Sequence, residues 1–288
     1  MPSFIFSWVG HLAVAYGVWL PAGAHLMAQS PELARERADY LAWLKEAPNS
    51  PFAALARQPV GAGLSLGPPD SDIPLEGLAL HRLATEGQSL VLQTPAGTRP
   101  VARGRPIMVG AYTLYLTASP RGSMATVFGK ASGKSPPGYY EYDPSLVFTS
   151  RLLPPEKPNP VRVLAADGIE AEATEAGSIV VSLGAPTRLR VLRIPSAAGE
   201  ESELEIFFRD QSNGHGTYPA GRFLSLVPLT DGNYRVDFNR ARNPFCAYNS
   251  VYPCPAPWRG NIIPAPVRAG ERYTGGGLEA VPQAGGTR

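Results

Sequence analysis

Short runs of strand-forming residues between clusters of glycine and proline restrict the fold of this chain most. The runs include 88–94, 112–118 and 161–165, which are rich in Val, Leu, Thr and Tyr. The chain has 31 prolines and 30 glycines among 288 residues, and these residues favour turns between strands. This spacing predicts a mostly β fold, with two antiparallel β-sandwich or barrel-like parts, rather than a doubly wound sheet.

The clearest alternation lies at residues 203–208. Leu204, Ile206 and Phe208 alternate with a second set that contains two glutamates. Period-two alternation predicts a strand with one apolar face toward the core and one mostly wet face. Residues 234–239 alternate in the same way.

One helix is predicted before the strands, at residues 30–47. Ser30 is a suitable N-cap, Pro31 fits the first helical position, and Glu32 is an acid in the first turn. The helix should end before Pro48, which disfavours helical geometry in the preceding residue. Its predicted buried face consists of Leu33, Tyr40, Leu41 and Leu44.

The N-terminal segment 1–29 leaves the compartment open. Its apolar stretch 4–20 would span only about 25 Å as a helix, which is short for a membrane span. It resembles a signal-peptide core with a cleavage site at 22–24, but no Lys or Arg precedes it. Alternatively, Met27 is the true start. We expect a cytoplasmic protein in that case and an exported one otherwise. The first alternative is the prediction, and no membrane partner is expected.

Composition excludes one class of partner. The net charge is +2 and no four basic residues follow one another. The sequence therefore lacks the concentrated positive charge of a protein that binds nucleic acid through its phosphates. No group of His, Cys, Asp and Glu has metal-ligand spacing, and no cofactor is predicted. The segment 129–144 has turn chemistry and marks a joint between β domains at 55–130 and 140–274, with a flexible tail at 275–288.

Polar residues concentrate between 209 and 261. If the alternation of 203–208 continues, Asp210 points toward the core and needs a partner, which backbone N–H groups of the following turn, Arg222 or Arg240 would supply. The set has two interpretations: polar ties for irregular loops, or a pocket that binds a small polar or anionic ligand or a protein partner. The predicted ligand-binding residues are Arg209, Asp210, Tyr218, Arg222, Asp237, Asn239 and Arg240.

The leading hypothesis is a non-catalytic binding protein, because general bases are scarce in this region. The alternative is a hydrolase-type enzyme with Asp210 or His215 as base and Arg222 stabilising negative charge. A third is an envelope structural protein, which needs segment 1–29 to be a signal. The two cysteines, Cys246 and Cys254, can close a proline-braced loop as a disulfide, or pack as buried thiols in a reducing compartment.

The same region resembles a known family. Its signature residues here are Phe208-Arg209-Asp210, Gly214, Thr217-Tyr218, Gly221 to Leu224, Asp237 to Ala241, Asn243-Pro244, Cys246 to Tyr248, Cys254-Pro255, Asn261 and Ala269-Gly270-Glu271. Together they are similar to the uncharacterised prokaryotic family catalogued as domain of unknown function 1684, strongly over 200–272 and weakly back to residue 30. The chain departs from the pattern at Arg242, Phe245 and 258–260. The resemblance implies a site but no reaction.

Residues 64–118 have a second, looser likeness. Its residues are Leu66-Gly67, Ser71 to Leu75, His81, Leu90 to Leu92, Gly97 and Gly110 to Leu116. They are similar in layout to a forkhead-associated domain, which implies a β-sandwich. Pro68 and Pro69 stand where that family has its phosphothreonine-binding arginine, so the likeness implies the fold alone.

Overall fold

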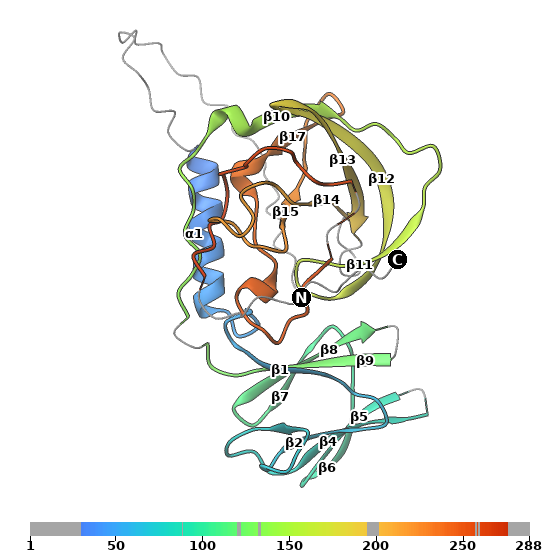
Figure 1. The fold of residues 1–288 in the computed structure, drawn as a ribbon. Coiled ribbons are helices and arrows are strands. Elements are labelled where there is room, and N and C mark those ends of the chain that lie inside the picture. The colour runs from blue at the N-terminus through green and yellow to red at the C-terminus, as the bar shows by residue number, and fades with distance from the viewer. Residues whose placement is uncertain are drawn as a thin grey trace, which may run out of the picture.

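The structure is a computed structural model that describes residues 30–87, 89–119, 122–131, 134–194, 202–256, 258 and 260–275. In this part of the chain the fold is mostly β, with one α-helix before the strands. Among the described residues, every pair of adjacent strands is antiparallel except one, and none of the four sheets closes into a barrel (Figure 1). The predicted fold class is confirmed.

The N-terminal β part, residues 54–128, contains two sheets around one aliphatic core. Its strands are β1 (Ala54–Pro59), β2 (Leu64–Gly67), β3 (Ile73–Pro74), β4 (His81–Glu86), β5 (Ser89–Thr94), β6 (Gly97–Val101), β7 (Pro106–Val109), β8 (Tyr112–Ser119) and β9 (Gly122–Phe128). The sheet orders are β3-β2-β4-β5-β6 and β1-β9-β8-β7. Alternate residues such as Leu83, Leu92 and Leu114 point into the shared core. The forkhead-associated likeness of this part stays a prediction.

The C-terminal β part, residues 138–273, contains the longest strands. Its elements are η1 (Pro144–Leu146), β10 (Val147–Arg151), β11 (Pro160–Leu164), β12 (Glu170–Leu183), β13 (Ala185–Ile194), β14 (Glu203–Phe208), β15 (Arg222–Ser225), β16 (Val227–Pro228), β17 (Asn233–Asp237), η2 (Phe238–Arg240) and η3 (Phe245–Ala247). The sheets run β11-β12-β13-β14-β15 and β10-β17-β16. The curved β12–β13 hairpin wraps one side of this part (Figure 1).

Strand β14 differs from its prediction. Leu204, Ile206 and Phe208 face the main core as expected, but the other face is buried as well. Phe207 stacks on Phe223 with ring centroids 4.4 Å apart and belongs to a second apolar cluster. The prediction that this second face is mostly exposed to water was therefore wrong, because a second apolar layer covers it.

Prolines occupy the borders of the sheets. Of the eight edge strands in the part of the chain that the structure describes, six contain one, at Pro59, Pro74, Pro100, Pro106, Pro160 and Pro228. Proline lacks the N–H that an inner strand needs for its ladder, so it is tolerated at edges and discourages further strand addition there. This placement accounts for part of the high proline content.

Helix α1 (Pro31–Glu46) lies along the C-terminal β part (Figure 1). The Ser30 hydroxyl accepts from the backbone N–H of Leu33 at 3.2 Å, and the backbone becomes extended at Ala47, before Pro48, as predicted. Leu33 and Leu44 are buried, with Arg37 between them on the docked face. The arginine was not expected there.

The two β parts meet through a mixed cluster. Ala53 and Phe128 pack with Tyr218, Cys246 and Tyr252 of the C-terminal part. The predicted domain boundaries stay a prediction. Segment 1–29 and all of the tail except Gly275 lie outside the described residues. In the part of the chain described, no helix is long and apolar enough to cross a membrane.

Candidate functional site

Asp210 and Arg222 form an ion pair in the core of the C-terminal β part. The Arg222 Nη2 lies 3.0 Å from Asp210 Oδ2, and both side chains are 0% exposed. Arg222 also donates to the carbonyls of Val267 and Ala269. Asp210 Oδ1 accepts from the backbone N–H groups of Ser212 at 2.7 Å and Val267 at 3.0 Å. The expected partners of Asp210 are therefore confirmed for the turn amides and Arg222.

This pair ties loops together and has no free acceptor to offer a substrate. Both Asp210 oxygens are engaged, and Arg222 is enclosed by backbone carbonyls. His215 is exposed, and its Nδ1 lies 3.3 Å from the carbonyl oxygen of Asn213. The geometry gives the proposed hydrolase residues no common open site.

Asn239 lies in a second polar cluster, at the end of β17. Its Oδ1 accepts from the N–H of Asp143 at 2.9 Å, and its Nδ2 donates to the Asp143 carbonyl and to Asp237 Oδ1, each at 2.9 Å. All of its side-chain contacts are internal ties. They fix the segment before η1 against the η2 turn.

Arg240 joins this place to helix α1. Its guanidinium lies 2.8 Å from Glu32 and 2.7 Å from Glu36, and 3.7 Å from Asp237. Arg37 adds a hydrogen bond of 2.7 Å to the Asn239 carbonyl. Asp237, Asn239 and Arg240 therefore serve helix docking.

Tyr218 lies in a third location, next to the two cysteines. Cys246 and Cys254 form a disulfide, which is the first of the two alternatives predicted for them. The Tyr218 hydroxyl lies 3.3 and 3.2 Å from their sulfurs, and burial raises the pKa of Tyr218 to about 12. Arg209 is exposed at the end of β14. The seven predicted residues thus occupy separate places and do not line one pocket.

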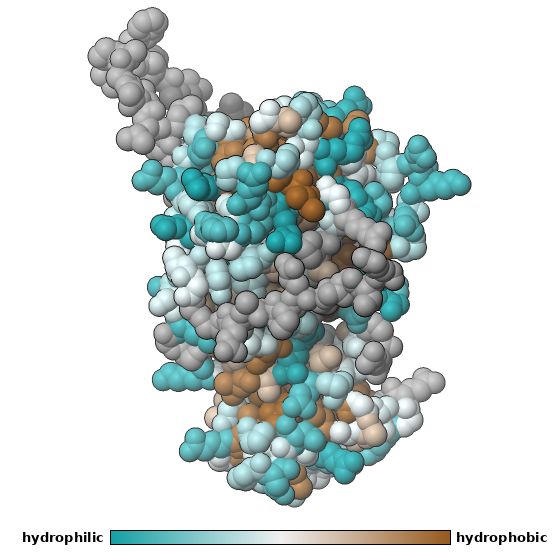
Figure 2. Space-filling view, in the orientation of Figure 1, coloured by the Kyte–Doolittle hydropathy of each residue, from teal (hydrophilic) through white to brown (hydrophobic). Residues whose placement is uncertain are grey.

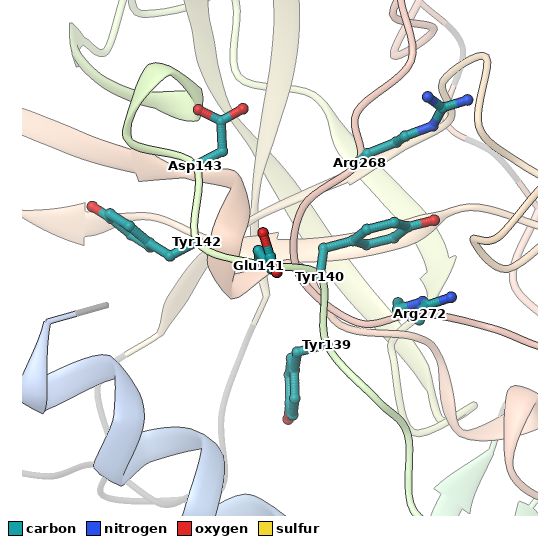
Figure 3. A pocket seen from close by; sticks show the side chains of 7 residues that line it. All are labelled: Tyr139, Tyr140, Glu141, Tyr142, Asp143, Arg268 and Arg272. Atoms are coloured by element: carbon teal, nitrogen blue, oxygen red, sulfur yellow. The ribbon is translucent and has the colours of Figure 1, made fainter. Parts of the chain in front are cut away.

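A cavity of about 570 Å³ lies elsewhere in the C-terminal β part (Figure 3). One wall is the extended segment 138–143, which we call the strap. The strap pairs with 270–272: Tyr140 N–H donates to the Gly270 carbonyl at 2.9 Å, and Arg272 N–H to the Gly138 carbonyl at 2.8 Å. The lining residues are Tyr139, Tyr140, Glu141, Tyr142, Asp143, Arg268 and Arg272. We call this cavity the groove.

Two arginines give the groove its chemistry. Arg268, Arg272 and the ring of Tyr140 extend to the same side, whereas Tyr139 points toward α1 (Figure 3). The Arg272 guanidinium lies over the Tyr140 ring, 5.3 Å from its centroid. Both arginines are exposed, and among the described residues no carboxylate lies within 4.0 Å of either guanidinium.

Sequence reasoning missed the groove. Its strap falls in the segment interpreted as a domain joint, although three tyrosines within four residues, at 139, 140 and 142, follow the Pro136-Pro137-Gly138 turn. Several tyrosines gathered in one short segment are a signal for a contact surface. The arginines at 268 and 272 stand about 130 residues away, so their approach depends on the fold.

Glu271 lies beside the strap, opposite Tyr139 in an isolated bridge. It is 0% exposed. Its Oε2 accepts from the Asn243 N–H at 2.7 Å and from the Tyr248 hydroxyl, whereas its Oε1 is buried without a hydrogen bond. Burial raises the pKa of Glu271 to about 7, although Tyr248, Asn243 and nearby arginines partly oppose the shift.

A small cavity of about 30 Å³ separates helix α1 from this region. Its polar lining includes two stacked pairs: Arg37 over the Tyr139 ring at 4.3 Å, and Arg242 over the Tyr40 ring at 5.7 Å. A space of this size accommodates about one water molecule. In the described residues, no group of three or more His, Cys, Asp and Glu could hold a metal ion.

Comparisons with known proteins found matches that include the C-terminal β part. A search of curated proteins found no match. The solution NMR structure of an uncharacterized protein from Haloarcula marismortui is 29% identical, with a TM-score of 0.41, over 47% of this chain and 75% of that one. Residues 138–272 match the family described as "Protein of unknown function (DUF1684)". The match begins at the strap and ends at Arg272, the two segments that pair beside the groove. This match over residues 138–272 confirms the family resemblance that the signature residues predicted.

Proposed function

We propose that this is a non-catalytic binding protein whose groove holds a small ligand with a carboxylate or phosphate group. The supporting observation is the pair of exposed guanidinium groups, Arg268 and Arg272, on the same side of the groove without a carboxylate partner among the described residues. Arginine presents several donors in a planar fork that matches carboxylate and phosphate oxygens.

The size and the aromatic lining also suit a small molecule. A volume of about 570 Å³ falls within the range of roughly 300–1,000 Å³ typical of ligand pockets. Arg272 is already stacked on Tyr140, which restricts both side chains before a ligand arrives. Such preorganisation reduces the entropy that binding must overcome.

The lining favours binding over catalysis. It contains neither His nor Cys, and Glu271, with its pKa of about 7, is buried and does not line the groove. The oxygen Oδ1 of Asp143 already accepts from the Ser145 N–H at 2.9 Å. The lining carboxylates are Glu141 and Asp143 of the strap, and neither has a His or Cys beside it in the lining, whereas the two guanidinium groups are available to bind an anion.

The test uses the purified full chain with inorganic phosphate and citrate as probes. Titration calorimetry compares the natural protein with Arg268→Gln/Arg272→Gln, which removes both charges but keeps polar side chains. Arg105→Gln is the matched control, since Arg105 is an exposed arginine of the N-terminal β part. We expect the double variant to bind at least about tenfold more weakly, the loss of one good charged contact, and the control to bind normally.

Two results would overturn the proposal. One is equal anion binding by the natural protein and the double variant. The other is the absence of binding to either probe combined with native mass spectra that show no acidic small molecule retained from the cell. Circular dichroism of each variant confirms that the fold is intact.

A further inference from the structure

The buried carboxyl group of Glu271 does not line the groove, and its hydrogen bonds go to Asn243 and Tyr248 rather than to the Asp210–Arg222 pair. One of its oxygens accepts two hydrogen bonds, and the other is buried with none. An ionised carboxylate in that position lacks part of the hydrogen bonding that water would provide. A protonated one is neutral and loses far less on burial. The site therefore distinguishes the two protonation states of Glu271.

Helix α1 is connected to this carboxyl group through tyrosines. The Tyr248 hydroxyl donates to Glu271, and it also interacts with the side chain of Tyr40 on α1. Burial and the neighbouring carboxyl group hold the pKa of Tyr248 far above its ordinary value. Tyr248 thus keeps its proton and remains a donor to Glu271 across the pH range of interest.

Titratable and charged groups surround Glu271 from each element packed against it. They are Arg37 and Tyr40 of α1, Tyr139 of the strap, Arg222 of β15, Arg242 after η2, and Tyr248 after η3. The arginines favour the ionised form, and the tyrosines remain neutral. Two of these groups belong to α1, so the environment of Glu271 is complete only while the helix is docked.

We propose that Glu271 makes the docking of α1 on the C-terminal β part sensitive to pH, with the protonated carboxyl group favouring the docked helix. When the helix undocks, Tyr40 and Arg37 no longer cover the groups around Glu271, and water can reach its carboxyl group. The ionised carboxylate gains most from that hydration, and this gain outweighs the loss of the Arg37 charge, because burial is the largest influence on Glu271. Ionisation therefore shifts the equilibrium toward the undocked helix.

The direction follows from linkage. The pKa of Glu271 is about 7 in the folded protein, above its ordinary value of 4.5. The docked state then binds the proton more tightly than a state in which Glu271 meets water. The contribution to docking is full below pH 4.5 and is lost as the pH rises through 7. The Arg240 ion pairs with Glu32 and Glu36 cross the same interface, so the test compares variants rather than pH alone.

Hydrogen exchange of the α1 amides measures docking directly. Protection factors, corrected for intrinsic exchange, are compared at pH 5.5 and pH 7.5 in the full chain. We expect α1 to lose about tenfold in protection over this interval in the natural protein. In Glu271→Gln, which keeps an oxygen that accepts from Tyr248, we expect the change to disappear.

Glu205→Gln provides the matched control. Glu205 is also buried, and burial raises its pKa to about 7, but it lies on β14 and acts on the cluster around Glu271 through the charge of Arg242 rather than through a hydrogen bond to Tyr248. This variant should keep the pH dependence of α1. Should Glu271→Gln fail to fold, Tyr40→Phe removes the helix-side hydroxyl and should reduce the change with pH. The proposal is wrong if protection of α1 is the same at both pH values in the natural protein, or if Glu271→Gln retains the natural change.

Discussion

The two β parts bury different kinds of residue. The N-terminal β part has an aliphatic core, and its buried polar side chains are limited to Ser123 and Thr126 among the residues described. The C-terminal β part buries charged groups as well, including Asp210, Arg222 and Glu271. Apolar residues also gather on the visible face of the N-terminal part, whereas hydrophilic ones prevail above it (Figure 2).

Loop structure explains the difference. Strands of the N-terminal part follow one another closely and satisfy their backbone groups within the two sheets. The C-terminal part has long irregular segments, whose buried N–H and C=O groups need side-chain partners. Asp210 illustrates the solution, because its Oδ1 accepts from the N–H groups of Ser212 and Val267, which lie outside the strands. Asn261 bridges β13 and β14 where they no longer pair: it bonds the backbone N–H and carbonyl of Arg190, at 2.7 and 2.9 Å, and the carbonyl of Phe207 at 3.1 Å. Buried polarity here is evidence of irregular backbone, not of a binding site.

The largest loss of stability is expected when the Asp210–Arg222 ion pair is broken. Arg222→Met leaves Asp210 buried without its charged partner and should cost about 3–5 kcal/mol in the free energy of unfolding. Adding Asp210→Asn should recover part of the loss, because an amide still accepts from the Ser212 and Val267 N–H groups. Urea denaturation measures both variants.

An apolar truncation in the other part provides the contrast. Leu83→Ala should cost about 2–5 kcal/mol through a cavity alone. If Arg222→Met costs less than about 1 kcal/mol, or if the second substitution adds to its loss, the buried pair is not the structural tie described here.

The disulfide gives a smaller effect. Replacing Cys246 and Cys254 by serine releases a loop that also carries Asn249, whose Nδ2 bonds the carbonyls of Pro51 and Ala54. For a sequence separation of eight residues, the loss should be about 2–3 kcal/mol. Thermal unfolding of the natural protein with and without a dithiol reductant should show a similar difference. Equal midpoints would mean that the loop is held by packing alone.

The smallest effect concerns the partly exposed ion pairs of α1. Arg240→Gln removes the contacts with Glu32 and Glu36, whose side chains are nearly half exposed, so solvent screens them. We expect a cost of about 1 kcal/mol or less, measured by urea denaturation. A loss as large as that of Arg222→Met would show that helix docking depends on these pairs more than on its buried face.

Patterns local in the sequence predicted the fold class, helix α1 and the need of Asp210 for a partner. Each depends on residues within one element or on the next turn. The grouping of the polar residues failed because it depends on how irregular loops fold. Tyr218 turns toward the disulfide, Arg240 toward α1, and Asp210 toward Arg222. The groove needed the pairing of 138–140 with 270–272, which no local pattern indicates.

A phosphate titration followed by backbone NMR shifts tests the central claim most directly, because it locates binding without prior choice of a residue. We predict that the shifted amides cluster in the strap, 138–143, and in 268–272. Shifts concentrated around Asp210 and Arg222, or none that saturate, would contradict the assignment of the groove.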